Sequence, residues 1–568
     1  MKVLGIWDGH NASAAAVEDG RIMAAVAEER LTRRKMQRGF PHQSIPLVLA
    51  LAGWTPEEVD LVAAAGRYGR LPLRLLDARY SASGLSPGPM TPAQRIFRHV
   101  ESLVPAIPAV RSMESTASAA VLRSRLRSAG FPQKTPVTLV PHHRAHAYGA
   151  AAMLRTDGAV LTMDGYGDGL WATLHRCSGG SLARVTALPY LSSIAVTYGA
   201  VCQALGFREG DEGKVTALAA SGDPGPLLPL FLAKFGLAKA GSFDSGSLLR
   251  GGLPGRRELA RLSSTRPEDV AAALQEACER YVLAFLRSRL PEPPPSLALA
   301  GGLFANVSLN RRVADHLASS DVLVYPPMTD QGLSLGAALA ACSPPPPLRP
   351  AFTTPFLGDS VSCQDGAGAA RSMGLSVATS PRPERRCAEV LAAGGTVALV
   401  TGREEFGPRA LGNRSLLFAA TSLDLADRVQ SMLHRSRLMP FAPVCRQERA
   451  QSLFLPPWPA PTHEDLGLGY MTFAVRARED TGTRFPAAVH RDGSARVQVV
   501  SRTFNPRLWL VLEQYEALTG LPLLINTSFN LHGEPIVHAA DDSLRTFVAS
   551  GVDLLLLGDL LVRTGGPA

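Results

Sequence analysis

Apolar and polar positions at the start of the chain follow the pattern of short strands joined by tight turns. Residues 3–7 (VLGIW) form one apolar run, and residues 12–18 (ASAAAVE) form a second one. The dipeptide Asp19-Gly20 that comes next is typical of a two-residue hairpin turn. We therefore predict a strand, a polar loop over DGHNAS, and a hairpin whose second arm is residues 21–29 (RIMAAVAEE).

The same pattern returns in residues 158–176 (GAVLTMDGYGDGLWATLHR), which again predict a strand, an Asp-Gly loop and a strand. Proteins of the actin, sugar-kinase and Hsp70 class begin in this way, and their first loop faces a nucleotide phosphate. Two copies predict a duplicated, two-lobed α/β domain with its ligand between the lobes. In residues 297–317, an apolar strand ends at Gly301-Gly302 before a helix that opens near Asn306, which would offer backbone amides to a nucleotide.

Four consecutive prolines in residues 342–350 (CSPPPPLRP) mark a linker, because proline continues neither a helix nor a sheet. We therefore expect an N-terminal domain over residues 1–342, a linker over 343–352 and a C-terminal domain over 353–568. In the second domain, the apolar runs 395–400 and 521–526 are candidate buried strands, and residues 542–562 predict a helix followed by a strand.

Composition limits the class of protein. A hydrophobic content of 46% with 19% charged residues is typical of a globular chain, and no apolar run reaches the roughly 18 residues of a membrane span. The first residues lack the apolar core of a signal peptide, and seven scattered cysteines without a CxxC pair favour reduced thiols. We therefore expect a cytoplasmic protein without a membrane partner.

The net charge of +9 and the basic run 31–38 (LTRRKMQR) are features found in nucleic-acid-binding proteins. However, the 58 basic residues include only six lysines, and the arginines are spread through an alanine- and glycine-rich chain. This distribution indicates the bias of a GC-rich coding sequence rather than one basic surface. We therefore do not expect nucleic acid as a partner.

A candidate metal site begins in residues 141–150 (PHHRAHAYGA), where His142 and His146 are four residues apart. Side chains at this spacing lie one above the other on a helix, so both imidazoles could reach one ion. The alternative is that the two histidines only share a helix face. His143 is either a third ligand or a hydrogen-bonding neighbour.

Carboxylates that could complete this site follow predicted strands or precede a glycine: Asp164, Asp168 and Asp330. Each of them alone could instead cap a turn. Two histidines with two carboxylates, and a position left for water or ligand, suit Fe²⁺, Mn²⁺ or Zn²⁺.

A candidate anion site lies in the glycine-rich residues 404–417 (EEFGPRALGNRSLL), which contain Arg409 and Arg414. Two guanidiniums on a constrained loop would bind phosphate or carbamate oxygens, although pairing with Glu404 and Glu405 is the structural alternative. Polar clusters that end apolar strands add further candidates, which a capped turn would also explain: His490, Arg496, Asn526, Ser528, Asn530 and His532.

Taken in order, nine segments resemble the O-carbamoyltransferases of antibiotic and Nod-factor biosynthesis: DGHNASAA, HHRAHAYGA, MDGYGDG, GGLFANVSLN, TDQGLSLGAAL, GREEFGPRALGNRSLL, MPFAPV, DGSARVQVV and NTSFNLHGEPIV. The resemblance spans nearly the whole chain. It implies an N-terminal domain like the tRNA threonylcarbamoyl-transferring protein Kae1, of the actin/Hsp70-like class, and a C-terminal YrdC-like α/β domain. It also implies that the second domain makes carbamoyl-adenylate from carbamoyl phosphate and ATP with Mg²⁺, and that the first passes the carbamoyl group to the hydroxyl of a small molecule.

The resemblance assigns roles by motif position. The metal ligands would be His142, His146, Asp164 and Asp330, with Fe²⁺ or another divalent ion such as Mn²⁺ or Zn²⁺. His10 would lie near the reacting carbamoyl group, where it is suited to be the base for the acceptor hydroxyl, and Arg409, Arg414 and Arg496 would act in catalysis on the donor. Residues expected to bind the nucleotide or donor are Gly9, Asn11, Gly165, Lys214, Gly301, Gly302, Asn306, Asn526 and Asn530.

The chain departs from the family where basic residues are usual, because Leu433 and Met439 occupy those positions and no lysine follows Lys239. We expect Arg435 and Arg437 to take over the contacts to an anionic donor. Two other functions are compatible with parts of the pattern, a tRNA threonylcarbamoyl transferase and a non-catalytic ATP-binding module of the actin/Hsp70 type. The sequence leaves the acceptor and the oligomeric state open, a homodimer included.

Overall fold

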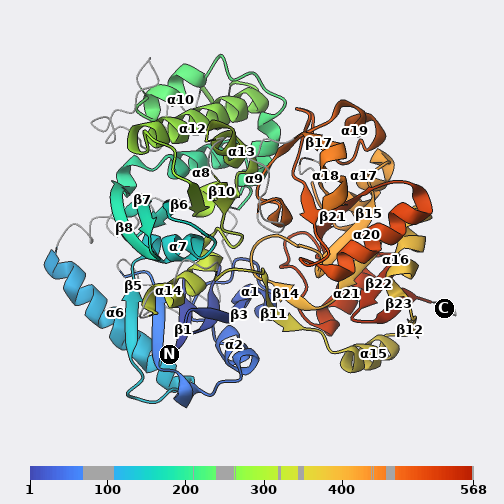
Figure 1. Ribbon diagram of the computed structural model, residues 1–568, viewed down its shortest axis with the longest axis horizontal. Coiled ribbons are helices and arrows are strands. Elements are labelled where there is room, and N and C mark those ends of the chain that lie inside the picture. Colours follow the sequence, from blue (N-terminus) through green and yellow to red (C-terminus); the bar gives the residue numbers. More distant parts are fainter. Residues whose placement is uncertain are drawn as a thin grey trace. The chain divides into compact units, whose positions relative to one another are not determined.

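The computed structural model describes residues 1–67, 108–208, 210–237, 261–262, 264–317, 321–342, 351–436, 438, 441–455 and 467–565. This part of the chain forms two compact units, drawn from blue to green and from yellow to red in Figure 1. Unit 1 comprises Met1–Thr32 and Met36–Thr353, and unit 2 comprises Arg33–Lys35 and Thr354–Ala568. Residues 343–350, the main part of the expected linker, lie outside the described residues.

The first lobe of unit 1 is built on a five-stranded sheet with the order β3-β2-β1-β4-β5. Its strands are β1 (Lys2–Trp7), β2 (Ser13–Glu18), β3 (Arg21–Ala27), β4 (Leu61–Ala65) and β5 (Val137–Val140). Strands β1 to β3 pair antiparallel, whereas β4 and β5 are added in parallel. Asp19 (φ 50°) and Gly20 (φ 78°) form the predicted turn. The predicted third strand ends two residues early, because Glu28 and Glu29 open helix α1 (Glu28–Thr32).

The second lobe repeats this topology on a sheet with the order β10-β9-β6-β7-β8. Its strands are β6 (Gly158–Gly167), β7 (Leu170–Ser178), β8 (Ser181–Pro189), β9 (Ser296–Ala300) and β10 (Asp321–Val324). The first three again pair antiparallel, and the last two are again added in parallel to β6. Strand for strand, the order and directions equal those of the first sheet. The duplicated two-lobed α/β architecture of the actin/Hsp70-like class, predicted from the sequence, is therefore confirmed.

Two short helices lie against each other in unit 1, α7 (His142–Ala151) and α14 (Leu333–Ala341), and α14 also packs on β1, β2 and β4 (Figure 1). A Cβ on Gly336 of α14 would lie 1.9 Å from the backbone oxygen of Ala145 in α7. Only glycine permits this approach. The other helices of unit 1 of five or more residues are α2 (Ser44–Ala52), α6 (Pro108–Ser128), α8 (Ile194–Ala204), α9 (Glu212–Ala219), α10 (Leu228–Lys234), α12 (Pro267–Arg289) and α13 (Val307–His316).

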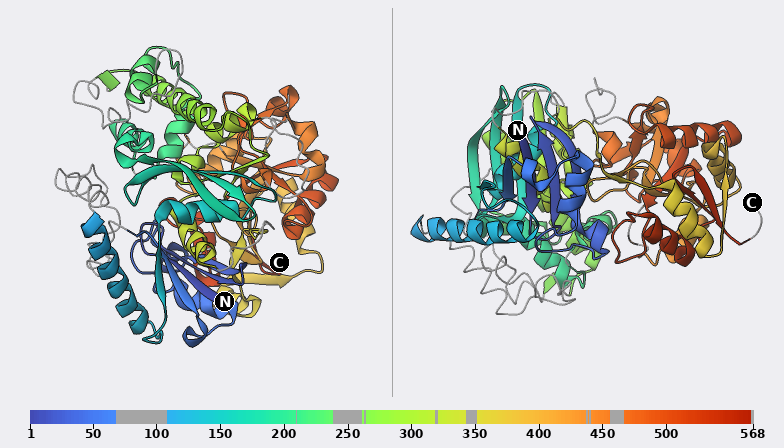
Figure 2. Two further views of the ribbon diagram at one scale, coloured as in Figure 1. Left: turned by 60° about the vertical axis from the view of Figure 1, so that its left-hand side comes forward. Right: turned by 90° about the horizontal axis from the view of Figure 1, so that it is seen from below.

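Unit 2 is a mixed α/β structure around an eight-stranded sheet with the order β12-β23-β22-β13-β15-β21-β16-β20 (Figure 2). These strands are β12 (Leu375–Thr379), β13 (Val397–Val400), β15 (Arg414–Ala419), β16 (Ala442–Arg446), β20 (Gln498–Val500), β21 (Leu523–Ser528), β22 (Leu554–Leu557) and β23 (Leu560–Thr564). The predicted strands at 395–400 and 521–526 correspond to β13 and β21. The predicted closing helix and strand correspond to α21 (Ala540–Ser550) and to β22 with β23.

Smaller sheets and helices complete unit 2. The short strands are β11 (Phe356–Ser360), β14 (Arg403–Glu405), β17 (Phe454–Leu455), β18 (Val475–Ala477) and β19 (Ser494–Ala495). The helices are α15 (Cys363–Ser372), α16 (Pro383–Ala392), α17 (Leu423–Met432), α18 (Gln447–Leu453), α19 (Glu479–Arg484) and α20 (Pro506–Thr519). The hydrophobic core of unit 2 contains Leu433, which has no measurable exposure. Leu433 is one of the two residues at positions where a basic residue is usual in the carbamoyltransferases that the sequence resembles.

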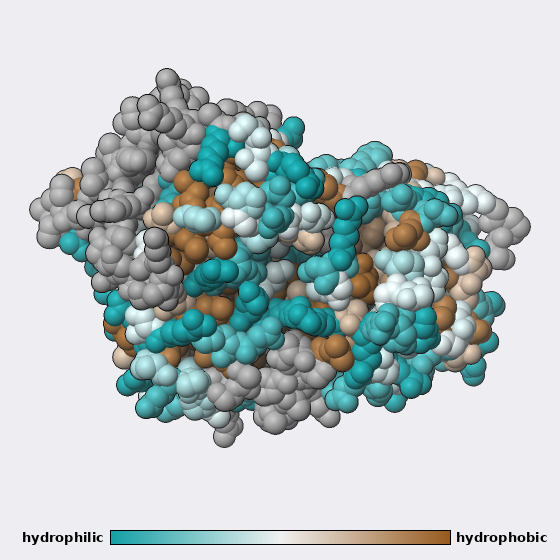
Figure 3. Space-filling view, turned by 90° about the horizontal axis from the view of Figure 1, so that it is seen from above, coloured by the Kyte–Doolittle hydropathy of each residue, from teal (hydrophilic) through white to brown (hydrophobic). Residues whose placement is uncertain are grey.

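Among the described residues, no helix combines the length and the hydropathy that crossing a bilayer requires. On the face drawn in Figure 3, hydrophobic side chains appear as separate brown groups between hydrophilic ones.

The contact between α7 and α14 provides a test of the fold. We predict that Gly336→Ala lowers the stability of unit 1 by about 3 kcal/mol, because the added methyl group overlaps the backbone of α7. Gly199→Ala in α8 is the matched control, since nothing lies within 4 Å of its Cβ position, and it should be neutral or slightly stabilising. Calorimetric melting of both variants measures the difference in stability. Equal melting temperatures would contradict the close approach of α14 to α7.

Candidate functional site

Helix α7 presents two buried imidazoles on one face. Pro141 precedes the helix, and the alanines of α7 favour the helical conformation. His142 and His146 therefore lie one turn apart, with ring centroids 4.8 Å from each other. Both residues are buried, at 2% and 0% exposure, so their ring nitrogens are directed into the protein.

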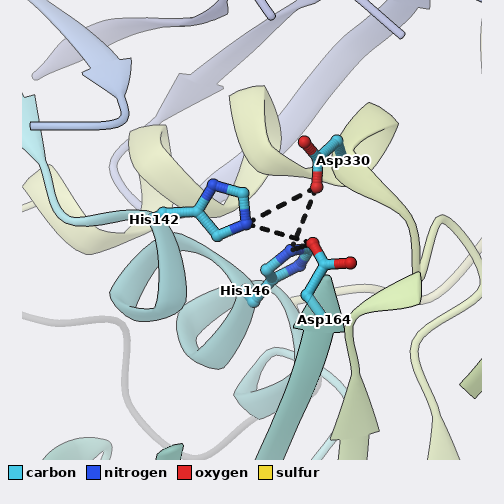
Figure 4. A group of neighbouring side chains, drawn as sticks. All are labelled: His142, His146, Asp164 and Asp330. Atoms are coloured by element: carbon cyan, nitrogen blue, oxygen red, sulfur yellow. Dashed lines mark hydrogen bonds and ion pairs between the residues drawn. The ribbon is translucent and has the colours of Figure 1, made fainter. Parts of the chain in front are cut away.

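Two carboxylates from other elements meet these imidazoles (Figure 4). Asp164 comes from the end of β6, and its Oδ2 lies 3.2 Å from Nε2 of His142 and 3.3 Å from Nε2 of His146. Asp330 opens the short 3₁₀ turn before α14, and its Oδ1 lies 3.5 Å from each of the same nitrogens. The four atoms that could bind an ion all lie within 4.8 Å of one another.

The charges of this cluster depend on each other. Burial opposes a charge on Asp164, but hydrogen bonds from His142 and His146 outweigh it and hold the pKa of Asp164 well below its usual range. Burial likewise disfavours a charge on His146, yet hydrogen bonds to Asp164 and Asp330 raise the pKa of His146 to about 9. The cluster therefore requires a positive charge between its two carboxylates, which a proton on His146 provides in the absence of an ion.

The donor set fits a divalent cation. Ligand atoms about 2.1 Å from one ion are about 3.0–3.4 Å apart at octahedral or tetrahedral angles. The four nitrogen–oxygen separations between the imidazoles and the carboxylates, 3.2–3.5 Å, are close to this range. The buried Oδ1 of Asp330 lies 3.5 Å from the two imidazole nitrogens and makes no hydrogen bond of good geometry among the described residues, as expected of an atom held for a ligand. Two neutral imidazoles with two carboxylates would neutralise Fe²⁺, Mn²⁺ or Zn²⁺.

Neighbouring residues resolve the alternatives that the sequence left open. His10, on the loop after β1, places Nε2 3.5 Å from Oδ2 of Asp330, with 41% of its side chain exposed, so it borders the cluster. His143 bonds Thr162 through Nδ1 at 2.8 Å and is a neighbour rather than a member of the cluster. Asp168 accepts hydrogen bonds from the backbone N–H groups of His142 and Arg67, so it holds the start of α7.

The residues expected to bind nucleotide in unit 1 fall into two groups. The backbone N–H groups of Gly165 and Gly302 hold Oδ1 of Asp164, at 2.7 and 3.2 Å, so they position a cluster residue. Gly301 turns the chain at φ 101° directly before, while Gly9 and Asn11 flank His10 on the loop after β1, with Asn11 at φ 58°.

The other two candidates of unit 1 are already engaged. The amide of Asn306 caps α13 and bonds Gln275, a buried residue that the sequence did not single out. Lys214 pairs with Asp211 at 2.8 Å. A nucleotide would have to separate these pairs to contact either side chain.

Unit 2 contains a cluster of opposite sign, formed by Arg409, Arg435 and Arg496. Burial lowers the pKa of Arg409 and of Arg435 to about 10. Burial and the nearby charges of the other two guanidiniums lower the pKa of Arg496 well below its usual range. Three positive charges close together and partly removed from water repel one another, and a bound anion would relieve this repulsion.

Arg435 of this cluster is the residue expected to replace the missing basic residues, and its guanidinium bonds residues at the end of β21 and just after it. Its guanidinium bonds the Thr527 hydroxyl, the carbonyl and the hydroxyl of Ser528 (both 2.8 Å), and Oδ1 of Asn530 (3.2 Å). Arg437 and Met439 lie outside the described residues. Asn530 thus positions Arg435, and Asn526 bonds Gln498 at 2.7 Å while its buried Oδ1 has no hydrogen-bond partner among the described residues.

The expected pairing of Arg409 with Arg414 as one anion receptor is wrong. Arg414 has no measurable exposure, and its guanidinium donates to the backbone carbonyls of Asp359, Thr401, Gly402, Asn413 and His538. Its donors stabilise the chain around β15 and are not available to a ligand. Glu405 accepts from three backbone N–H groups, and Glu404 bonds His538. His490 lies near Arg496, and burial lowers its pKa to about 4.

Comparison with known proteins identifies the family. The family model described as carbamoyltransferase N-terminus matches residues 2–245 and 253–339, and the one described as carbamoyltransferase C-terminus matches residues 388–564. The chain belongs to the carbamoyltransferase family. It is therefore an enzyme that transfers carbamoyl groups, which excludes the non-catalytic ATP-binding module.

Relatives of this carbamoyltransferase include nodulation proteins. The nodulation protein NolNO of Sinorhizobium fredii is 31% identical over 98% of this chain and 80% of its own length. The nodulation protein NolO of Bradyrhizobium diazoefficiens is 35% identical over 74% of this chain and 78% of its own length.

Solved structures are much less similar. Component A of the (R)-2-hydroxyglutaryl-CoA dehydratase of Acidaminococcus fermentans is 14% identical over 60% of this chain and 96% of its own, with a TM-score of 0.31. A ROK-family glucokinase of Streptomyces griseus in complex with glucose and AMPPNP is 14% identical over 60% and 98%, with a TM-score of 0.28. The fold assignment of the carbamoyltransferase rests on its repeated strand order instead.

The coupling of His146 to the carboxylates predicts a pH effect in the metal-free protein. A charged His146 contributes stability that is complete below its unfolded pKa near 6.5 and is lost as the pH rises through about 9. Asp164→Asn removes a charged partner, so the pKa of His146 should fall, and the loss of stability between pH 6.5 and 9, about 3 kcal/mol in the parent, should shrink.

The measurement is histidine NMR together with thermal melting in chelator. Asp157→Asn is the control, because the Asp157 carboxylate is exposed and bonds Ser178 and Gly179 instead. An unchanged His146 titration in Asp164→Asn would contradict the arrangement.

Proposed function

We propose that this carbamoyltransferase uses ATP and a divalent metal to move a carbamoyl group from carbamoyl phosphate, through carbamoyl-adenylate, to a hydroxyl of a small molecule. The observation that carries the proposal is the presence of two clusters of like-charged side chains, a pair of buried carboxylates in unit 1 and three partly buried guanidiniums in unit 2. The His/Asp cluster of unit 1 requires a cation, and the arginine cluster of unit 2 requires an anion. Carbamoyl phosphate and carbamate are anions of the kind that buried guanidiniums bind.

Donor activation is assigned to unit 2. Water first hydrolyses carbamoyl phosphate to carbamate and inorganic phosphate. An oxygen of the carbamate then attacks the α-phosphorus of ATP, from which pyrophosphate leaves with the bonding electrons. Arg409, Arg435 and Arg496 would hold the anionic oxygens through this step, because their charges are already concentrated and desolvated. The product is carbamoyl-adenylate, whose AMP is a better leaving group than any that carbamate offers. Mg²⁺ would accompany the ATP phosphates.

Carbamoyl transfer is assigned to unit 1. A divalent ion bound by His142, His146, Asp164 and Asp330 would supply Lewis acidity there. The oxygen of the acceptor hydroxyl forms a bond to the carbamoyl carbon, and the bond to AMP breaks. His10 borders the cluster and is partly open to solvent, which suits it to take the hydroxyl proton. Gly165 and Gly302 would keep Asp164 in place throughout.

The activity itself is tested by incubating the protein with ATP, carbamoyl phosphate and a panel of polyhydroxylated acceptors, followed by mass spectrometry. A product heavier by one carbamoyl group, dependent on all three components, is the expected result. A product formed equally without ATP would exclude the adenylate route.

Separation of the two steps gives the next prediction. Arg409→Ala should abolish carbamoyl-phosphate-dependent release of pyrophosphate and leave bound metal unchanged, because it removes a charge-assisted contact to the donor. His142→Ala should lose metal and transfer but still release pyrophosphate. Pyrophosphate and elemental metal assays on both variants check this, and full pyrophosphate release by Arg409→Ala would refute the division of labour.

The role of Arg435 predicts a selective effect on the donor. Arg435→Ala should raise the KM for carbamoyl phosphate or lower kcat at least tenfold, about 1.4 kcal/mol, because the donor charge is left partly unpaired. Arg545→Ala, an exposed position of α21, is the charge-matched control and should behave like the parent. Steady-state kinetics at saturating ATP compare Arg435→Ala with Arg545→Ala, and melting temperatures equal to that of the parent show that both variants are folded. Parental kinetics in Arg435→Ala would point to a donor other than carbamoyl phosphate.

A further inference from the structure

A cavity lies in unit 1 beside the start of α7, with a volume of about 330 Å³. Its walls come from α7 and from β7 and β8, and they include Arg144, Tyr148, Thr173, His175, Leu182 and Arg184. His142, His146, Asp164 and Asp330 are not part of its lining, so it is distinct from the candidate metal cluster. Cavities of about 300 Å³ are large enough for a small organic molecule.

The walls carry an excess of positive charge. Arg184 of β8 is the cross-strand partner of His175 in β7, so both side chains emerge on the same face of the sheet. The guanidinium of Arg144 lies over the ring of Tyr148, 5.4 Å from its centroid. Within the described part of the chain, neither Arg144 nor Arg184 forms an ion pair. Asp168 also lines the cavity, but its oxygens accept from the backbone N–H groups of His142 and Arg67.

One ring nitrogen of His175, in the wall of the cavity, lacks a hydrogen-bond partner among the described residues. The residue is 6% exposed, and its Nε2 lies 2.9 Å from Oγ1 of Thr173. Its buried Nδ1 has no hydrogen-bond partner among the described residues. Burial, together with the charges of Arg184 and Arg144, lowers the pKa of His175 to about 4, so the ring is neutral near pH 7. A buried nitrogen without a partner is unfavourable unless a ligand satisfies it.

The hydroxyl chain behind His175 allows this nitrogen to be a donor. Thr173 bonds Thr162 at 2.6 Å, and Thr162 bonds Nδ1 of His143 at 2.8 Å. The hydroxyl protons of such a chain can point in either direction. When they point toward His175, Nε2 accepts from Thr173 and the ring proton is on Nδ1, where it can be donated to an anion.

We propose that this cavity binds a small organic anion, a carboxylate or phosphate monoester attached to an apolar group, with Arg144, Arg184 and Nδ1 of His175 as its donors. Tyr148 and Leu182 provide apolar surface for the remainder of the ligand. The site is independent of the donor and acceptor sites proposed above. The hydroxyl chain ends at His143, whose ring centroid lies 5.3 Å from that of His142, so the chain ends beside the metal cluster.

The test uses benzoate and phenyl phosphate as probes and neutral benzamide as a comparison, titrated against the full chain by ligand-observed NMR. We expect saturable binding of one or both anions and much weaker binding of benzamide, and the stronger anion identifies the head group. Arg184→Gln should weaken anion binding about tenfold, because one charge-assisted contact is lost. Leu182→Trp should weaken it similarly by filling the cavity without changing any charge.

Two controls locate the binding. Arg176→Gln removes the same charge next to His175, from an exposed position outside the cavity lining, and should bind like the parent. Arg409→Gln alters the arginine cluster of unit 2 and should also leave probe binding unchanged. No saturable binding, equal affinities in Arg184→Gln and Arg176→Gln, or a loss confined to Arg409→Gln would each overturn the proposal. Melting temperatures show whether a variant is folded.

Discussion

Two buried carboxylates that share one small space set the main constraint on unit 1. Asp164 and Asp330 both approach the Nε2 atoms of His142 and His146, and like charges this close are tolerated only with a cation between them. The surrounding structure maintains this arrangement. Gly165 and Gly302 donate to Asp164, and Gly336 lets α14 approach α7 closely enough for the four side chains to meet. The duplicated topology thus brings the end of β6, the start of α7 and the turn before α14 to one point.

The arginine cluster of unit 2 needs a negative charge, whereas the carboxylates of unit 1 need a positive one. This contrast supports the proposal that donor activation and carbamoyl transfer take place at different clusters. Three neighbouring guanidiniums favour an anion, whereas the His/Asp cluster favours a cation. Arg414 belongs to neither role. Its guanidinium is enclosed by backbone carbonyls, so it stabilises the loop that carries Arg409 rather than binding a ligand. The two arginines of this motif therefore have different surroundings, and only Arg409 belongs to the arginine cluster.

Much of the fold could be predicted from the sequence, because strand patterns and the turn at Asp19-Gly20 are encoded locally. The site was harder to predict. Spacing suggested that His142 and His146 share a helix face, but it could not distinguish Asp164 from Asp168, since both precede a glycine. Only the fold shows that Asp168 holds backbone N–H groups. The burial of Arg414 and the pairing of His175 with Arg184 depend on which strands become neighbours, which no local pattern specifies.

We expect His142, His146, Asp164 and Asp330 to bind the metal on which carbamoyl transfer depends. Anomalous scattering from crystals of active protein, collected on both sides of the absorption edge of the bound metal, would locate this ion. One strong peak should lie about 2.0–2.2 Å from both Nε2 atoms and from an oxygen of each carboxylate. Crystals of fully active protein without a peak among these four residues would show that transfer does not depend on a metal at this position.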